Sequence, residues 1–244
     1  MAQALTRSFV GKGRFWLQAS GGKLYELGNV DKCTFSAKVD SDKVQDYTKG
    51  GGGVAATYSA ISDASFALSL VDFNAKNLAL ALFGAATAQA ASTVTDEAVV
   101  ANLGGLVPLA KAGATAHAVK HTSGTPTYVL DTDYEVTGAG IIIKTGGAIT
   151  DDQALKVSYS YPAQTNIQAL LNSGQEFRLV IDGLNDADSG KAHVIEAYRW
   201  KPDPSGFEPI GDKLGRLQLA GMVLADATKT GTGTSKYLRM QQVD

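Results

Sequence analysis

Two of the three histidines of the chain stand four residues apart, a spacing that could bring two zinc ligands together. His117 and His121 lie in the stretch "TAHAVKHTSG", and on a helix such a pair shares one face. The stretch favours a β-strand instead, in which four residues separate two side chains by roughly 13 Å. That distance is too large for one ion, and neither a Cys pair nor an HExxH motif accompanies the histidines. We therefore expect no metal site.

Acidic and glycine-rich segments could bind calcium or phosphate, but each lacks a residue that this chemistry needs. "DADSG" at 186–190 is similar to the start of a calcium loop without its later bidentate Glu. It predicts an ordinary hairpin turn, as does "DTDYE" at 131–135. The glycines at 50–53 follow Lys49 instead of preceding a GK[ST] sequence, and "GTGTSK" also lacks the order of a phosphate loop.

Nucleophilic catalysis has no recognisable signature in the chain. No GxSxG motif occurs, and no serine or cysteine has an evident histidine partner. Groups distant in the sequence could still converge in the fold. We expect no catalytic residue, no metal and no cofactor, and a structural or binding role in place of an enzymatic one.

The composition limits the class of protein. The 244 residues suit one large β or α/β domain, or a core with an inserted module. With 22 basic and 24 acidic residues the net charge is -2, which argues against tight non-specific binding of nucleic acid. We see no signal peptide and no apolar run long enough for a bilayer, so we expect a soluble protein made in the cytoplasm. The single cysteine, Cys33, is expected to be a buried small hydrophobe.

The elements that must carry any site are mostly strands, because strict alternation of apolar and polar residues dominates the chain. In "KCTFSAKV" the residues Cys33, Phe35, Ala37 and Val39 share one face, and Lys32, Thr34, Ser36 and Lys38 share the other. In "DASFALSL" the apolar face is Ala64, Phe66, Leu68 and Leu70, and the opposite face is Asp63, Ser65, Ala67 and Ser69.

One helix is expected in "NAKNLALALFGA", with Asn74 as its cap and Gly84 as its stop. Short strands with close turn signals then predict a small β module at 91–161. The module interrupts a main β domain of residues 1–90 and 162–244, which resumes with "EFRLVIDG", "AHVIEAYRW", "GRLQLAGMVLA" and "KYLRMQQ". The predicted fold is mainly β, an antiparallel sandwich-like or barrel-like domain with one flanking α-helix and an inserted β module.

The strands "FALSL" and "FRLVI" carry no proline or inward charge that would protect a sheet edge. Pairing between copies is one solution, and a closed barrel or sandwich in a monomer is another.

The segments "GRFWLQASGGKLYELGNVDKCTFSAKVDSDKVQDYTKGGGG", "QEFRLVIDGLNDADSGKAHVIEAYRWKPDP" and "GRLQLAGMVLADAT" together resemble the tail tube protein (major tail protein) family of tailed bacteriophages. The resemblance implies hexameric rings whose sheets join into one β-barrel and stack into a hollow tube for the genome. It implies a place in the virion tail, after synthesis in the cytoplasm of the host bacterium. The implied partners are other copies, the tape measure protein and the tail tip and terminator proteins, with no membrane and no specific binding of DNA.

A barrel of roughly 24 strands, about four from each subunit, would be about 48 Å across its backbone and would leave room for duplex DNA. Small and acidic side chains on its wall would leave the DNA mobile. We therefore expect Asp63, Ser65 and Ser69 to face the lumen. Lys32 and Lys38 are expected either to pair with carboxylates of an adjacent subunit or to lie off the lumen.

Two further segments are expected to mediate assembly. The connection at 40–53 offers charges of both signs to the next ring, and its glycines would keep it mobile until it docks. Its residues are Asp40, Asp42, Lys43, Asp46, Tyr47, Lys49, Gly50, Gly51, Gly52 and Gly53. The N-terminal arm has a composition typical of interface anchors, in Arg7, Phe9, Lys12, Arg14, Phe15 and Trp16. The arm could instead be a first strand packed in its own core. The module is expected to face outward.

Two alternatives to this function stay open. One is the same tube role in a contractile tail, a pyocin or a type VI secretion machine. The other is a β-sandwich module for adhesion or carbohydrate binding, which would need exposed coplanar aromatics, and Trp16 and Trp200 are the only tryptophans.

Overall fold

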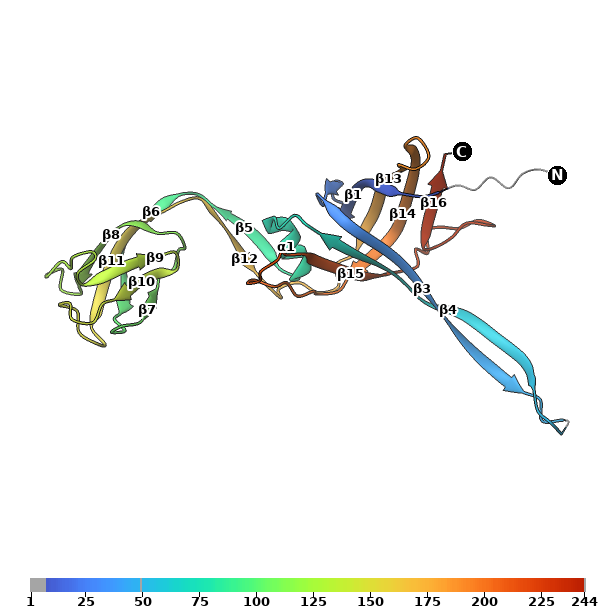
Figure 1. Cartoon of the computed structure of the whole chain (residues 1–244), viewed down its shortest axis with the longest axis horizontal. Coiled ribbons are helices and arrows are strands. Elements are labelled where there is room, and N and C mark those ends of the chain that lie inside the picture. Colours follow the sequence, from blue (N-terminus) through green and yellow to red (C-terminus); the bar gives the residue numbers. More distant parts are fainter. Residues whose placement is uncertain (1–7, 49, 244) are drawn as a thin grey trace. The chain divides into compact units, whose positions relative to one another are not determined.

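The chain folds into two compact units built mainly from antiparallel strands (Figure 1). The structure is a computed structural model that describes residues 8–48 and 50–243. We call the chain up to Ala86 and from Ile167 onward the main domain, and Thr87–Asn166 the inserted module. The mainly β class is confirmed, and the described residues contain one helix.

The limits of the module differ by a few residues from the predicted range of 91–161. Both chain crossings between the units are themselves strands, β5 (Ala85–Gln89) and β12 (Gln164–Gln168). These two strands pair only with each other among the described residues, as a two-stranded sheet.

An eight-stranded antiparallel sheet forms the main domain within the described residues. Its order is β2, β1, β13, β14, β15, β4, β3, and β16 pairs with β14 in addition. The long β14 pairs with β13 along one edge. Along its other edge it has two neighbours, because Trp200–Pro202 pair with β15 and His193–Ala197 pair with β16. The strands are β1 (Gly11–Ala19), β2 (Tyr25–Glu26), β3 (Val30–Gln45), β4 (Val54–Leu70), β13 (Phe177–Asn185), β14 (Lys191–Pro202), β15 (Leu217–Val223) and β16 (Leu238–Gln242).

One face of this sheet carries the core of the main domain. The predicted alternation holds where a second layer covers the strand, so that Phe66, Leu68 and Leu70 of β4 are buried while Ala67 between them is exposed. Other fully buried members are Leu17, Leu27, Leu179, Trp200, Leu217 and Leu219.

The predicted helix is confirmed as α1 (Ala75–Ala81). It begins where the side chain of Asn74 accepts a hydrogen bond from the backbone N–H of Asn77 at 2.8 Å, which satisfies one free donor of the first turn. Asn77 itself donates to the carbonyl of Leu27 at 2.7 Å, so the helix is fixed to the chain before β3. After the helix a side chain at Gly84 would meet the Gln168 carbonyl, with its Cβ only 2.2 Å away. Glycine is therefore required at this close approach.

Strands β3 and β4 form a long hairpin that leaves the rest of the sheet, as the blue and cyan ribbon of Figure 1 shows. They pair from Val30 opposite Leu70 to Gln45 opposite Val54. We call Val39–Ile61 the distal hairpin, and every described residue in it is exposed except Asp46, which is half-buried. Ordered pairing therefore continues far beyond the point where the core ends.

The predicted mobile connection at 40–53 is wrong for its first part. Asp40, Asp42 and Lys43 are strand residues paired with Ala60, Tyr58 and Thr57. The β-branched and hydroxyl residues of both arms favour a strand, so the turn is confined to residues 46–53 and is closed by a bond from the N–H of Asp46 to the carbonyl of Gly53. The glycines do serve this turn, because Gly51 and Gly52 have positive φ angles of 111° and 61°.

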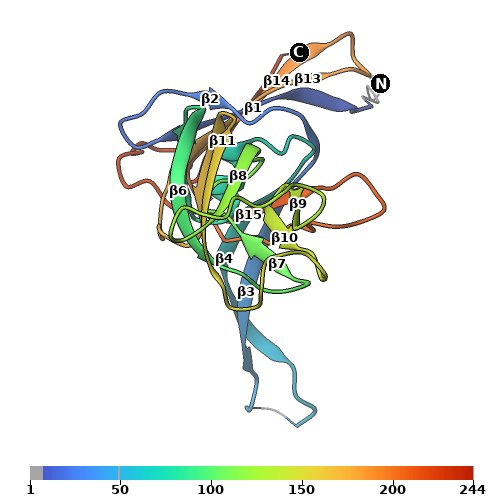
Figure 2. The ribbon, with the colours of Figure 1, turned by 90° about the vertical axis from the view of Figure 1, so that its left-hand side faces the viewer.

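The inserted module has two three-stranded sheets and a core of its own, and both sheets are visible in Figure 2. One contains β6 (Ser92–Val100), β11 (Ala154–Tyr161) and β8 (Thr115–His121), and the other β7 (Leu106–Pro108), β10 (Gly140–Ile143) and β9 (Tyr134–Thr137). Val119, Ile141, Ile143 and Val157 are fully buried between them. The module therefore has the hydrophobic core that an independent folding unit needs.

Candidate assembly surfaces

The face of the main sheet opposite the core carries the residues predicted to line a lumen. Asp63 and Ser65 are half-buried and Ala67 is exposed, and all three lie on the same side of β4. Ser65 is hydrogen-bonded to Ser36 of β3 across the strand pair at 2.8 Å. This part of the face is small and polar, as the alternation predicts.

Ser69 does not belong to that open surface, although the alternation places it there. Only 8% of the residue is exposed. Its hydroxyl accepts a hydrogen bond from Gln218 of β15 at 3.3 Å and also bonds to Asp31. Asp31 in turn forms an ion pair with Arg216 at 2.5 Å. Hydrogen bonds from Ser69 and then Arg216 lower the pKa of Asp31 below its ordinary value. Ser69 therefore joins three strands together.

The two lysines of β3 lie on the same face of the sheet as the residues predicted to line the lumen. The register places Lys38 directly opposite Asp63, and Lys32 opposite Ser69. Residues opposite each other in an antiparallel pair point to the same side of the sheet, so both lysines share the face of Asp63 and Ser65. Lys38 lies 3.7 Å from Asp40 of its own chain, and its charge is therefore balanced within the subunit.

Ion pairs extend across the same face, and the sequence alone does not reveal them. Glu196 of β14 is 7% exposed and lies between two arginines from neighbouring strands. Arg178 of β13 donates to it at 2.7 Å, and so does Arg239 of β16. Arg178 also reaches Gln18 of β1 at 3.3 Å. A buried carboxylate needs such donors, and the cross-strand pairing that supplies them could be found only from the register.

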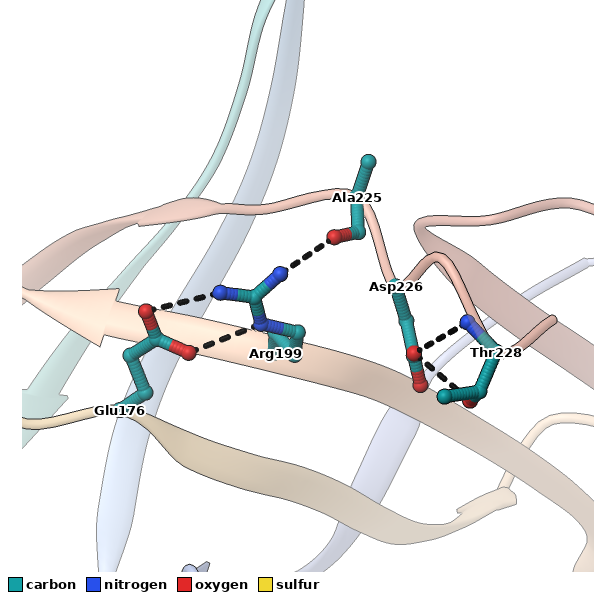
Figure 3. Close-up of polar contacts among 5 residues, drawn as sticks. All are labelled: Glu176, Arg199, Ala225, Asp226 and Thr228. Carbon is teal, nitrogen blue, oxygen red and sulfur yellow. Dashed lines mark hydrogen bonds and ion pairs between the residues drawn. The ribbon is translucent and has the colours of Figure 1, made fainter.

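A third arginine, Arg199, binds the chain segment that follows β15 (Figure 3). Arg199 of β14 donates to both carboxylate oxygens of Glu176, at 2.8 and 2.9 Å, and to the carbonyl of Ala225 at 2.7 Å. Just beyond, Asp226 accepts bonds from the N–H and hydroxyl of Thr228 at 2.9 and 2.7 Å. The bonds from Arg199 lower the pKa of Glu176, and those from Thr228 lower the pKa of Asp226. These contacts order the loop between β15 and β16.

The distal hairpin presents apolar side chains to solvent on both of its faces. Tyr47 at the turn is 89% exposed, and Val39, Val44, Val54, Tyr58 and Ile61 are exposed as well. Of the predicted charges, Asp46 is engaged within the turn, where it accepts from the N–H and hydroxyl of Thr48 at 2.8 and 2.5 Å. These bonds lower its pKa. Lys49 lies outside the described residues.

The predicted N-terminal arm is for the most part a core strand. Residues Gly11–Ala19 form β1, which pairs with β13 over its whole length, and Phe15 is buried in the core while Trp16 is half-buried on the other face. Phe15 is therefore in the first place a core residue of its own subunit.

The remaining residues of the arm lie at the surface. Phe9 packs edge-on against His193 with ring centres 5.0 Å apart. Lys12 pairs with Asp186 at 2.6 Å, and Arg14 lies 3.9 Å from Glu26. Arg7 lies outside the described residues.

Cys33 is exposed, contrary to the prediction that it is buried. It is on the core side of β3, opposite Leu68, but β3 is the last strand of the sheet and none of the described residues forms a second layer over it. Cys33 instead lines a cleft of about 410 Å³ between the start of β3 and the strands β1, β13 and β14. The neighbouring apolar groups desolvate the thiol and raise the pKa of Cys33 to about 11.

A family model described as "protein of unknown function UCP028589" matches residues 8–241 of the chain. The chain belongs to this family. No curated protein matches the sequence.

In this member of the family, the described residues hold no group of three or more His, Cys, Asp or Glu side chains arranged to bind a metal ion. His117 and His121 both lie on β8, as the sequence predicts. The His117 ring stacks on Tyr159, with centres 6.0 Å apart, and His121 bonds to Ser123 at 2.7 Å. Within 8–48 and 50–243, no helix has the length and apolar character needed to cross a membrane.

Proposed function

We propose that the protein is a structural subunit that assembles into stacked hexameric rings and forms the hollow tail tube through which phage DNA leaves the virion. Its partners are then other copies of itself, the tape measure protein and the proteins at the two tube ends. The observation that carries this proposal is the long hairpin β3–β4, whose distal part has no contact with the core and exposes six large apolar side chains.

Such a hairpin is costly for a protein that remains a monomer. Exposed apolar area loses about 25 cal/mol per Å² relative to burial, and contiguous exposed apolar surface usually marks an interface. In addition, β3 pairs only with β4 among the described strands, so that one edge of a 16-residue strand remains open. Open edges of this length bind other strands unless they are protected.

The hairpin also favours a tube over a closed dimer. It projects from one end of β3 and β4, whereas α1 follows the opposite end of β4. Two different surfaces that meet head to tail generate rings or open helical assemblies. In a stacked tube, one head-to-tail contact would close each ring, and another, made by the hairpin, would join one ring to the next.

The polar face of the sheet has the chemistry that a lumen needs. Ser65, Ala67 and Asp63 present small or acidic groups, and two of the basic groups on this face are paired with carboxylates of the same subunit, Lys38 with Asp40 and Arg178 with Glu196. Paired lysines and arginines release few counterions on contact with phosphate, so DNA is not retained.

The carbohydrate-binding alternative has no comparable support. The tyrosines of the inserted module, which contains no Phe or Trp, are Tyr128, Tyr134, Tyr159 and Tyr161. The first three are buried and the last is half-buried, and a flat exposed platform for a sugar ring cannot form from them.

Sedimentation velocity of the purified protein over a range of concentrations tests the proposal. We expect rings or long polymers for the wild type. A variant in which a two-residue turn replaces residues 40–60 should remain folded and monomeric. A wild-type protein that stays monomeric at all concentrations, with and without other tail components, would contradict the proposal.

A further inference from the structure

The core of the main domain is incomplete at the place where β3 leaves the sheet. Phe15 of β1 and Ile181 of β13 are buried there, and two residues further along the same face each strand carries a glycine, Gly13 and Gly183, which lie opposite each other. The absence of side chains at these positions leaves the cleft of about 410 Å³ between β1, β13 and β14 on one side and Cys33 on the other.

The two glycines cannot be replaced by residues that would fill the cleft. A Cβ at Gly13 would lie 2.4 Å from the carbonyl oxygen of Asp182, and one at Gly183 would lie 2.6 Å from that of His193. The strands thus approach too closely for any side chain. The cleft is a fixed feature of the sheet, and its other walls are mainly apolar, with Phe9, Val30 and Ile195 among them.

From this geometry we propose that the distal hairpin of a second copy docks in the cleft and completes the core there. The inference rests on the proposed function, since it names the receptor for the hairpin of the assembling subunit. A concave cleft cannot be filled by the same cleft of a partner, so the contact must involve a protruding element. The distal hairpin protrudes, and it exposes Val44, Tyr47 and Val54 next to its turn.

A hairpin cannot reach the cleft of its own chain. Cys33 and Gln45 lie on the same strand, and twelve residues of strand span about 40 Å. The part of β3 beyond Lys38 extends roughly 23 Å from the last core pair. That reach is sufficient to cross to a neighbouring subunit, which makes a second copy the natural occupant.

Apolar burial, and not charge, favours this contact. Of the charged residues that line the cleft, Lys12 and Asp31 already have ion-pair partners, Asp186 and Arg216. The third, Lys32, lies opposite Ser69 and therefore on the polar face of β3, away from Cys33.

The contact is directional, because the hairpin of each copy enters the cleft of the next and leaves its own cleft for another copy. Such a heterologous contact repeats without limit or closes only as a ring. It therefore accounts for growth beyond a dimer with a single pair of surfaces.

The native Cys33 allows a direct test with one introduced cysteine. In the variant Tyr47→Cys, mild oxidation of the assembled protein should yield a disulfide between Cys33 and the cysteine at position 47. A disulfide needs Cα atoms about 4.4 to 6.8 Å apart, and within one chain these positions are far too distant, so this link can form only between copies. A non-reducing gel should show a ladder that extends beyond the dimer, and mass spectrometry of the linked peptides identifies the pair.

The matched control is Thr232→Cys, which places an exposed cysteine on the loop between β15 and β16. It should give no disulfide with Cys33. Val44→Cys and Val54→Cys repeat the test at the two strand ends beside the turn. If polymers form but none of the three hairpin cysteines links to Cys33, the docking inference is wrong and the proposed function stands. If the wild-type protein forms no polymer, both are wrong.

Discussion

Two aliphatic residues on the same side of β4 provide a sharp test of the separation between folding and assembly. Ile61 and Leu68 both lie on the side of the strand that faces the core. Leu68 is 1% exposed, whereas Ile61 is 61% exposed because it lies beyond the end of the core. Truncation of each to alanine removes a similar number of carbon atoms from very different surroundings.

For the free subunit, Leu68→Ala should lower the free energy of unfolding by about 2 to 5 kcal/mol, as is usual for a cavity in a core. Ile61→Ala should change it by no more than about 0.5 kcal/mol, as for a typical surface residue. Urea unfolding of the subunit at concentrations below assembly measures both values.

For assembly, the larger effect is expected from Ile61→Ala. Full burial of an isoleucine contributes about 1.5 to 3 kcal/mol, and 61% of Ile61 remains available for burial, so a contact that covers it gains about 0.9 to 1.8 kcal/mol. Ile61→Ala should therefore raise the critical concentration for assembly by about 5- to 20-fold. Sedimentation measures this concentration. An unchanged critical concentration, or a loss of subunit stability as large as that of Leu68→Ala, would refute the view that the distal hairpin acts only in assembly.

Three further predictions concern the other surfaces. Phe15→Ala should cost about 3 to 5 kcal/mol of unfolding free energy because Phe15 is a core residue, whereas Phe9→Ala, which loses one ring pair with His193, should cost about 0.5 to 1.5 kcal/mol; equal losses in urea unfolding would contradict the assignment of β1. Ser65→Lys should permit tubes but slow the passage of DNA, and normal DNA ejection by phage that carry it would exclude Ser65 from the lumen. Because the pKa of Glu176 is lowered by Arg199, its ion pair stabilises the fold above the ordinary Glu value of 4.5 and is lost as the pH falls through the lower folded-state pKa. Urea midpoints between pH 6 and pH 3 should fall less in Glu176→Gln than in the wild type, and parallel curves would show that the pair has no role.

Local signals predicted the elements of the fold well. The alternation in "DASFALSL" and the cap at Asn74 depend on residues close in the sequence, and both β4 and α1 follow them. The insertion at residues near 91 to 161 was also predictable, because hairpin-sized strands with frequent turns replace the longer strands of the main domain.

Burial was less predictable, because alternation shows which residues share a face but not whether another layer covers that face. Cys33 and Phe35 of β3 alternate with polar residues as clearly as Phe66 and Leu68 of β4 do. Yet Cys33 and Phe35 are exposed, because β3 is an edge strand. The reverse error applies to Ser69, which Gln218 and Asp31 cover.

The face of the sheet on which a charged side chain lies depends on the pairing register. The register is set by residues far apart in the sequence, so local patterns do not predict it. Only the pairing of Lys38 with Asp63 shows that the lysines of β3 share the polar face. Likewise, the two arginines around Glu196 come from different strands. Arg178 of β13 is 18 residues from Glu196 in the sequence, and Arg239 of β16 is 43 residues from it. Four consecutive glycines suggested a long mobile loop, but pairing of the flanking strands reduces it to a short turn.

Electron cryomicroscopy of the purified, assembled protein would show whether the subunits form a tube. We expect hollow tubes of constant width, with end-on views that show six-fold rings and a lumen wide enough for duplex DNA. Monomers, closed dimers or solid filaments without a lumen would contradict the proposed function.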